Sequence, residues 1–160
     1  MHIRAAKESD IRALVVFNQA MASETESKLL PDDKIGPGVA AVFADTTKGF
    51  YVVAENDYRT ISGGLMVTYE WSDWRNAWFW WIQSVYILPE SRGKGLYRRM
   101  YEFVKERAAE AGNVCGFRLY VENDNYIAQK VYDGVGMQAS HYLMYEEEVS
   151  EPLPKVEKQY

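Results

Sequence analysis

The chain has 160 residues, 48% of them hydrophobic, and its 23 acidic side chains against 18 Lys and Arg give a formal net charge of −5. A chain of this size and charge fits one globular domain and disfavours general nucleic-acid binding. No apolar run approaches the roughly 20 residues of a membrane span, and the first residues lack a signal-peptide pattern. We therefore expect a cytoplasmic protein with no membrane partner. Cys115, His2 and His141 are too few for a disulfide framework or a zinc site, so no metal is expected.

The first half of the chain predicts two helices and three strands. Apolar side chains recur every three or four residues behind Ser9 or Asp10, either of which can cap a helix. Later segments are rich in branched and aromatic side chains, which favour strands. The predicted helices cover residues 10–23 and 34–44, and the predicted strands cover residues 3–5, 49–55 and 62–70.

The second half predicts three further strands and two helices. "AWFWWIQSVYI" is an apolar run long enough to lie in a sheet covered on both faces, and the spacing becomes helical from Gly95 to Gly112. Cys115 is predicted to be a small buried side chain. The predicted strands cover residues 77–87, 115–121 and 137–147, and a short helix covers residues 125–136. This order predicts a mixed α/β (α+β) domain over residues 1–148 and a loose tail at 149–160.

A glycine loop joins the predicted strand over residues 77–87 to a helix, within "SVYILPESRGKGLYRRM". A helix that begins near Gly95 leaves its first amides without intrahelical partners, and Gly93 and Gly95 let a ligand approach the backbone. The helix dipole, Arg92 and Lys94 add positive charge at the same place, which suits a pyrophosphate. Glycine in such a turn can also serve the backbone conformation alone, and the loop by itself leaves both explanations open.

Two common phosphate-binding loops do not match these residues. A Walker A loop requires Ser or Thr directly after its Lys, whereas Lys94 is followed by Gly95. A dinucleotide fingerprint requires a further glycine where Arg98 stands. Nucleotide hydrolysis and hydride transfer are therefore disfavoured.

Two blocks of the sequence resemble the GNAT N-acetyltransferase family. The first is the glycine loop, which is similar to the family's acetyl-coenzyme A (acetyl-CoA) motif Arg/Gln-x-x-Gly-x-Gly/Ala, with a tyrosine at the last place. It reads Arg92-Gly93-Lys94-Gly95-Leu96-Tyr97. The second, "LYVENDNYIAQKVYDGVGM", resembles the family's later strand-and-helix signature, with matches at Asn125, Ala128, Tyr132, Gly136 and Met137.

The resemblance covers most of the chain and implies both a fold and a co-substrate. The implied GNAT fold is a twisted, mixed, mostly antiparallel sheet with splayed central strands and flanking helices. The implied co-substrate is acetyl-CoA, with its pantetheine arm on one strand and its pyrophosphate on the amides of the glycine loop. The implied binding residues are Val85, Tyr86, Ile87, Arg92, Gly93, Lys94, Gly95, Leu96, Tyr97 and Asn125.

Acetyl transfer to an amine requires an uncharged nucleophile, a polarised thioester carbonyl and a proton for the departing thiolate. The resemblance implies that Tyr132 supplies this proton, and that Asn125 orients the pantetheine or caps its helix. Relatives often carry a glutamate base where this chain has Gln83, which is no useful proton acceptor. The base therefore stays open between water, Glu70 and Glu24.

A tryptophan-rich block, "YEWSDWRNAWFWW", bears on the acceptor. Its three tryptophans within the apolar strand are predicted to be core. Trp71 and Trp74 lie in a polar hairpin, where exposed rings beside carboxylates such as Glu24 can hold a cationic amine. We therefore predict an N-acetyltransferase in which a small primary amine attacks acetyl-CoA directly in a ternary complex. The family resemblance is also compatible with a homodimer that pairs through the last strands or the exposed hairpin.

Two alternatives remain open from the sequence. Acetylation of a protein lysine or N-terminus would require an open groove without the Trp71 and Trp74 pair. A non-catalytic acyl-CoA-binding module is suggested by Gln83 in place of a base and by Tyr97 in the loop.

Overall fold

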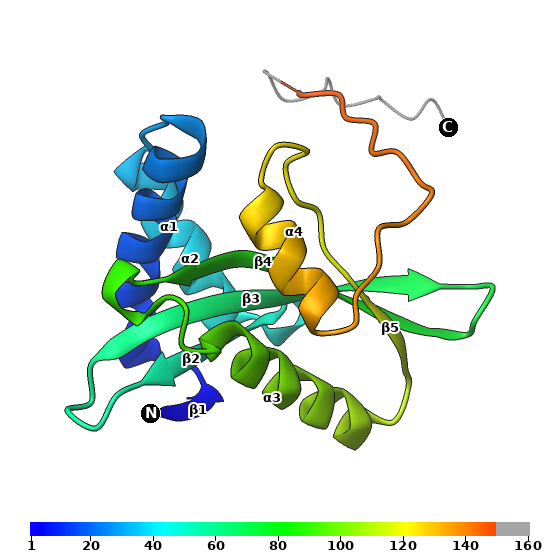
Figure 1. The fold of residues 1–160 in the computed structure, drawn as a ribbon, viewed down its shortest axis with the longest axis horizontal. Coiled ribbons are helices and arrows are strands. Elements are labelled where there is room, and N and C mark those ends of the chain that lie inside the picture. The colour runs from blue at the N-terminus through cyan, green and yellow to red at the C-terminus, as the bar shows by residue number, and fades with distance from the viewer. Residues whose placement is uncertain (150–160) are drawn as a thin grey trace, which may run out of the picture.

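The computed structural model of the protein describes residues 1–149 (Figure 1). The strands are β1 (His2–Ala5), β2 (Phe50–Glu55), β3 (Ile61–Ser72), β4 (Ala77–Ile87) and β5 (Val114–Arg118). The helices are α1 (Ile11–Glu26), α2 (Asp32–Ala44), α3 (Leu96–Ala111) and α4 (Tyr126–Gly134), with 3-10 turns at Glu8–Asp10, Thr46–Lys48 and Pro89–Ser91. The strands and helices predicted up to residue 136 are all present, with ends shifted by no more than a few residues.

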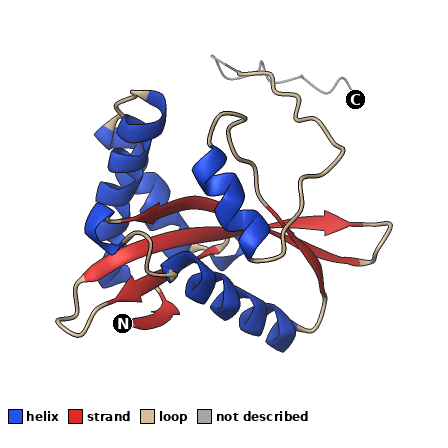
Figure 2. Ribbon diagram, viewed as in Figure 1, coloured by secondary structure: helices blue, strands red, loops and turns tan. Residues whose placement is uncertain are grey.

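The strands form one mixed sheet in the order β1-β2-β3-β4-β5. Neighbours from β1 to β4 are antiparallel, whereas β4 and β5 are parallel. Helices α3 and α4 cover one face of the sheet, and α1 and α2 lie on the other (Figures 1 and 2). The predicted fold class, a mixed and mostly antiparallel sheet with flanking helices, is confirmed.

Two apolar clusters hold the helices on the sheet. In α3 a buried side chain recurs every four residues, which places one continuous stripe against the sheet. This stripe consists of Leu96, Met100, Val104 and Ala108. On the other face, Leu14 of α1 and Val39 of α2 pack on Val53. The stripe fixes the first turn of α3 directly after the end of β4.

Strand β4 carries a bulge at Ser84, whose φ of 51° lies in the left-handed region. The register shows the extra residue, because Met66 of β3 pairs with Gln83 while Gly64 pairs with Tyr86. Beyond the bulge the side-chain alternation is shifted by one, so Tyr86 returns to the α1 face and contacts Phe17. Pairing with β5 ends at Trp81, which leaves the last part of β4 open on that side.

Two sequence predictions about the second half are wrong. Residues 137–147 form no strand, because the described chain leaves the sheet after α4 and does not pair with β5. Cys115 is exposed, since β5 lies at the edge of the sheet and its register is irregular at this residue. The predicted loose tail lies, from residue 150 onward, outside the described residues. Within the described part, no helix has the length and apolar character needed to cross a membrane.

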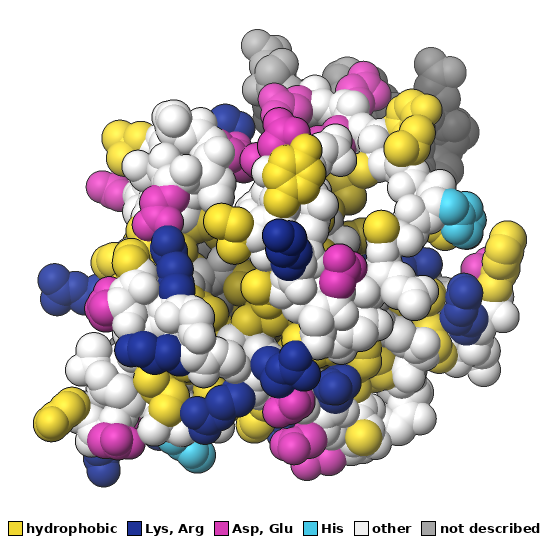
Figure 3. Space-filling model, in the orientation of Figure 1, with side chains coloured by type: hydrophobic (Ala, Val, Ile, Leu, Met, Phe, Trp, Pro, Cys, Tyr) yellow, Lys and Arg dark blue, Asp and Glu magenta, His cyan; other side chains and the backbone are white. Residues whose placement is uncertain are grey.

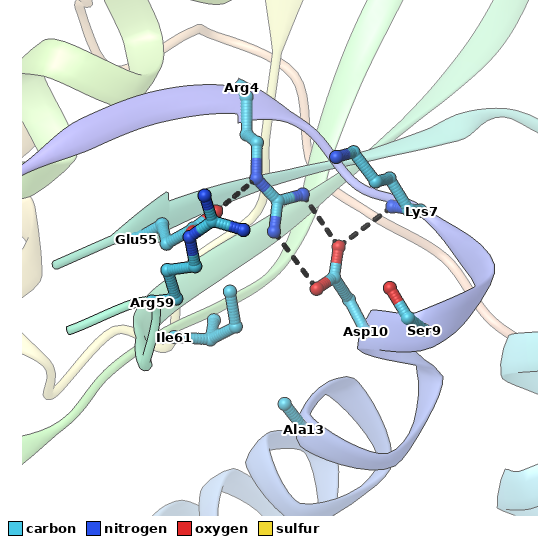
Figure 4. Close-up of a pocket in the computed structure, with 8 residues that line it drawn as sticks. All are labelled: Arg4, Lys7, Ser9, Asp10, Ala13, Glu55, Arg59 and Ile61. Atoms are coloured by element: carbon cyan, nitrogen blue, oxygen red, sulfur yellow. Dashed lines mark hydrogen bonds and ion pairs between the residues drawn. The ribbon is translucent and has the colours of Figure 1, made fainter. Parts of the chain in front are cut away.

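A buried ion-pair network ties β1 to the start of α1 and to β2 (Figure 4). The Arg4 guanidinium donates to both carboxylate oxygens of Asp10, at 2.7 and 3.0 Å, and also to Glu55. The Asp10 side chain is only 7% exposed. Burial alone would raise the pKa of Asp10, but the bonds from Arg4 and from the amide of Lys7 outweigh it and lower that pKa below its usual 3.8.

We predict that this network makes the protein sensitive to acid. A carboxyl group with a lowered pKa in the folded state stabilises that state above its unfolded pKa, and the stabilisation is lost as the pH falls through the folded pKa. Asp10→Asn should lower the free energy of unfolding at pH 7 by about 2 kcal/mol and flatten its decline below pH 4. Urea unfolding between pH 2 and pH 7 measures both. Asp57→Asn, at a carboxylate 91% exposed, should change neither, and equal effects of the two variants would contradict the prediction.

Candidate active site

The loop between β4 and α3 has the backbone conformation that only glycine adopts easily. Gly93 and Gly95 have φ values of 73° and 72°, in the left-handed region. A Cβ atom at either position would meet no other atom within 4 Å. The glycines therefore serve the conformation of the turn and also leave free space in front of the helix, through which a ligand could approach the backbone.

The amides of this loop are free to bind an anion. The Arg99 amide donates to the Gly95 carbonyl at 3.2 Å, which begins the hydrogen bonding of α3. Among the described residues, no acceptor pairs with the amides from Gly93 to Arg98. Unpaired amides at the positive end of a helix dipole form a site for phosphate oxygens.

Basic side chains gather over the start of α3 (Figure 3). Three of them donate to backbone carbonyl oxygens: Lys94 to Glu90 at 2.8 Å, Arg98 to Gly134 at 2.7 Å and Arg99 to Met1 at 2.7 Å. No carboxylate in residues 1–149 forms an ion pair with these three side chains. Their charge therefore adds to the potential that an incoming phosphate meets.

Tyr97 points into the core and not toward the glycines. The residue is 5% exposed, its ring meets the Tyr132 ring edge-on at 5.2 Å, and its hydroxyl lies 3.9 Å from the Met137 sulfur. The tyrosine at this place of the motif thus leaves the anion site open. It also connects the two sequence blocks, because Tyr132 and Met137 belong to the second.

Tyr132 lies on α4 and packs against the same apolar cluster as Val85 and Ile87 of β4. Burial raises the pKa of its phenol above the usual value of 10. The group therefore keeps its proton throughout the neutral range, as a general acid must. Asn125 caps this helix, since its side-chain oxygen accepts from the amide of Ala128 at 3.1 Å.

Glu24 reaches from the last turns of α1 to the end of β4. One carboxylate oxygen accepts from the Tyr86 hydroxyl at 2.7 Å, and the other accepts from the Arg92 guanidinium at 2.7 Å. These two bonds, that of Tyr86 first, lower the pKa of Glu24. Arg92 also donates to the Ile87 carbonyl at 2.9 Å. A carboxylate thus stays ionised beside the strand segment that was predicted to hold the thioester.

Gln83 and Glu70 are separated along the α1 face of the sheet. Gln83 donates to the Thr68 hydroxyl. Glu70 accepts from Arg118 at 2.9 and 3.1 Å and from the indole of Trp81. Glu70 is opposite Phe79, four residues before Gln83, which corresponds to about 13 Å along the strand. The structure therefore places Glu70 in a separate polar cluster, away from Gln83.

Trp71 and Trp74 do not meet Glu24. Trp71 pairs with Trp78 across the strands and packs on it edge-on at 4.9 Å, on the α3 face of the sheet. Trp78 precedes Tyr86 by eight residues, which corresponds to about 25 Å along the strand. Trp74, 89% exposed, lies in the turn beyond. The three residues predicted to bind the amine therefore do not form one cage.

Sequence reasoning missed two side chains near these groups. It used only the backbone of Tyr86, whereas the hydroxyl holds Glu24. It also overlooked Arg118, which pairs with Glu70 and lies over the Phe79 ring at 3.6 Å. Alternation along β4 could have placed Phe79, Trp81 and Gln83 on one face, but a contact across three strands has no local signal.

Comparison with known proteins agrees with this geometry. The sequence matches the profile of the acetyltransferase (GNAT) family over residues 15–137. A possible acetyltransferase from Clostridium difficile 630 is 40% identical, with a TM-score of 0.85 over 94% of this chain and 98% of that one. The chain therefore belongs to the GNAT family and is an N-acetyltransferase that uses acetyl-CoA. A search of curated protein sequences gave no match.

Two more distant structures share the fold. A predicted acetyltransferase with acetyl-CoA from Clostridium acetobutylicum is 19% identical, with a TM-score of 0.74 over 91% of this chain and 95% of that one. AAC(6')-Iy in complex with a bisubstrate analogue, CoA-S-monomethyl-acetylneamine, is 13% identical, with a TM-score of 0.74 over 92% of this chain and 97% of that one. Among residues 1–149, no three His, Cys, Asp or Glu side chains are grouped so that they could hold a metal ion.

Proposed function

We propose that this N-acetyltransferase acetylates a primary amine of a small molecule, which attacks acetyl-CoA directly in a ternary complex. The observation that carries the proposal is the ionised carboxylate of Glu24, which the Tyr86 hydroxyl holds at the open end of β4. Its two oxygens already accept from Tyr86 and from Arg92, and because a carboxylate has about four acceptor sites, the group can also accept from a protonated amine at the place where the thioester is expected. AAC(6')-Iy, in complex with its bisubstrate analogue, shares the fold and offers an analogy for a small-molecule acceptor.

The glycine loop suits the pyrophosphate of acetyl-CoA. The free amides from Gly93 to Arg98 and the space beside both glycines support this assignment. Val85 and Ile87 have no β5 partner, so their backbone groups on that side of β4 can receive the pantetheine arm, except the Ile87 carbonyl, which accepts from Arg92. The amide of Ile87 is the proposed donor to the thioester carbonyl.

The proposed reaction uses two protein side chains, Glu24 to bind the amine and Tyr132 to protonate the thiolate, and water carries the remaining proton. The bound ammonium loses a proton to solvent, and the free amine forms a bond to the carbonyl carbon as the carbon–sulfur bond breaks. Tyr132 gives its proton to the departing thiolate and recovers one from the nitrogen through solvent. Because its pKa is lowered, Glu24 is a weak base, and we assign it to binding the amine while water carries the proton. Gln83, with Thr68, lines the acceptor side and accepts no proton.

Trp71, Trp74 and Glu70 have no part in this proposed site, because they lie far along the hairpin or in a separate cluster. The cytoplasmic location and the homodimer remain proposals. Acetylation of a protein lysine or N-terminus is the alternative within the same chemistry, and a non-catalytic acyl-CoA-binding module is the alternative outside it.

The first test measures thiol release from acetyl-CoA with polyamines, amino acids, aminoglycosides and peptides as acceptors. Turnover on a small amine is the expected result. Turnover only on peptides would favour the protein-directed alternative, and tight acetyl-CoA binding without turnover on any acceptor would favour the binding module.

Glu24→Gln tests the assigned role of this carboxylate. Loss of one charged partner should raise the KM for the amine roughly 10-fold and leave the Kd for acetyl-CoA within about twofold. Glu26→Gln is the matched control, because Glu26 lies one half-turn further along α1 and pairs with Lys28 on the surface. An unchanged KM in Glu24→Gln, or the same change in both variants, would contradict the assignment.

A further inference from the structure

Trp81 is a tryptophan of β4 that does not join the core. The sequence pattern predicts a core side chain, but Trp81 is only partly buried and belongs to neither apolar cluster. Alternation along β4 explains the difference, because Trp80 and Ile82 face α3 and Trp81 therefore faces the α1 side, as Gln83 does. A large aromatic ring thus lies on the α1 side of the sheet outside its apolar cluster.

Tyr120 forms an aromatic pair with Trp81 across two strands. Arg118 of β5 pairs in register with Trp81, and Tyr120 follows two residues later along the chain. The ring centres of Tyr120 and Trp81 are 6.4 Å apart, and Tyr120 is 62% exposed. We call these two side chains the aromatic wall. It presents partly exposed ring surface on the α1 side of the sheet.

A chain of contacts holds the Trp81 ring in one orientation. The indole N–H donates to a carboxylate oxygen of Glu70. Arg118 holds Glu70 in turn, and the Arg118 guanidinium lies over the Phe79 ring at 3.6 Å. Gly116 leaves the space that Phe79 occupies, since a Cβ atom there would come within 2.7 Å of that ring. Glu70 touches none of the reacting groups, but it fixes the ring that a ligand would meet, and a fixed ring loses little freedom on binding.

The aromatic wall lies beside the place of the proposed reaction. Trp81 precedes Val85 by four residues, one of which forms the bulge, so the two lie about 10 Å apart along β4. Gln83, which lines the acceptor side of the proposed site, stands between them on the same face as Trp81. An acceptor whose amine lies at the end of β4 can therefore extend its other atoms over the wall.

The charges beside the wall bear on the kind of acceptor that it suits. Arg118 pairs with Glu70 at 2.9 Å. This pair carries no net charge, so it offers little attraction to a second ammonium group of an acceptor. Aromatic rings, by contrast, attract one another in offset or edge-on arrangements with centres about 4.5 to 7 Å apart. The wall therefore favours a flat aromatic body over a second cationic group.

We propose that the acceptor is a primary amine that carries an aromatic ring on a short alkyl chain, and that Trp81 and Tyr120 bind this ring. The inference rests on the proposed function, because it takes the small-amine acceptor and its place beside Glu24 as given. The amine lies at the thioester, and the alkyl chain follows β4 past Gln83 to the wall. The bound ring covers apolar surface of both side chains that is exposed in the free protein.

Two matched amines test this proposal. Phenethylamine and cyclohexylethylamine have the same alkyl chain and similar size, but only the first has a flat aromatic ring. Wild-type kcat/KM should be roughly 10-fold higher for phenethylamine. Trp81→Leu should abolish this preference and leave kcat/KM for cyclohexylethylamine within about twofold. Trp71→Leu is the matched control, because it removes an indole from the opposite face of the same hairpin.

Two further variants separate ring binding from folding. Trp81→Phe keeps a ring and should retain most of the preference. Tyr120→Leu, at a residue 62% exposed, should reduce the preference without changing thermal unfolding. Putrescine, as a third acceptor, tests the alternative of a second ammonium group. Equal turnover of the two matched amines, faster turnover of putrescine, or a preference that persists in Trp81→Leu would each overturn the inference and leave the proposed function in place.

A binding measurement decides the case in which no small amine is acetylated. That result would contradict the proposed function itself, and calorimetric titration of phenethylamine into the wild type and into Trp81→Leu would then test the wall alone. Binding that is roughly 10-fold weaker in Trp81→Leu would support the wall as a site for aromatic rings. Equal binding by the two proteins, or no binding by either, would overturn it.

Discussion

Gly95→Asp is expected to weaken acetyl-CoA binding by roughly 100-fold or more, because like-charge contacts cost several kcal/mol. The new carboxylate would stand in the space beside the free amides, which is open in the structure. The fold should survive, since aspartate tolerates the left-handed conformation at a cost of about 1 kcal/mol. Isothermal titration of acetyl-CoA measures the affinity, and thermal unfolding measures the stability.

Gly112 provides the matched control for this change. It has a φ of 76°, it lies at the other end of the same helix, and a Cβ there would also meet no atom within 4 Å. Gly112→Asp should therefore cost similar stability without affecting acetyl-CoA binding. Gly95→Asn has nearly the size of Gly95→Asp without its charge, and it should therefore bind acetyl-CoA more tightly than Gly95→Asp does. Wild-type affinity in Gly95→Asp would remove the glycine loop from the proposed binding site.

Tyr132→Phe is expected to lower kcat about 100-fold, the usual contribution of a general acid. The ring remains, so its packing against Tyr97 and the stability of α4 should be preserved. The KM values for acetyl-CoA and for the amine should change little, because the lost proton transfer belongs to the transition state. Initial rates of thiol release at saturating amine measure the effect.

Tyr101→Phe controls for the loss of a phenol from the same aromatic group. Tyr101 stacks on Tyr97 with ring centres 6.0 Å apart and is 6% exposed, but it lies one turn further along α3. Its loss should leave kcat within about twofold. A faster reaction of Tyr132→Phe with an acyl donor that has a more acidic leaving thiol would further support the role as an acid. An unchanged kcat would show that another group or water protonates the thiolate.

Most of the fold followed from local patterns in the sequence. The run "AWFWWIQSVYI" marks β4 at its observed bounds, Ala77–Ile87, because an apolar strand covered on both faces has a distinct composition. The four-residue spacing from Leu96 to Ala108 placed α3, and Asn125 indicated the cap of α4. The glycine loop was recognisable because the turn needs a positive φ at Gly93 and Gly95, and glycine is the residue that adopts such a φ easily.

What the sequence did not show is contacts between segments that are distant in the sequence. Glu70 looked available as a base, but Arg118, from two strands away, occupies it. Trp71 looked like part of an amine cage, yet alternation and register place it on the opposite face of the sheet from Glu24. The predicted strand at residues 137–147 had the right alternation, but alternation does not show whether a segment pairs with a sheet edge, and among the described residues this segment pairs with none.

The bulge at Ser84 divides β4 into two stretches in which residues of opposite parity, even before it and odd after it, face α3. Before it, even-numbered residues such as Trp80 and Ile82 face α3, and after it the odd-numbered Val85 and Ile87 do so. The bulge at this one residue therefore decides which face of the sheet each later side chain of β4 takes. Straightening the strand with Ser84 kept in it would turn the Tyr86 hydroxyl from the α1 side of the sheet to the α3 side, away from Glu24, whereas deleting Ser84 would remove the bulge and leave Val85, Tyr86 and Ile87 on the faces they occupy now.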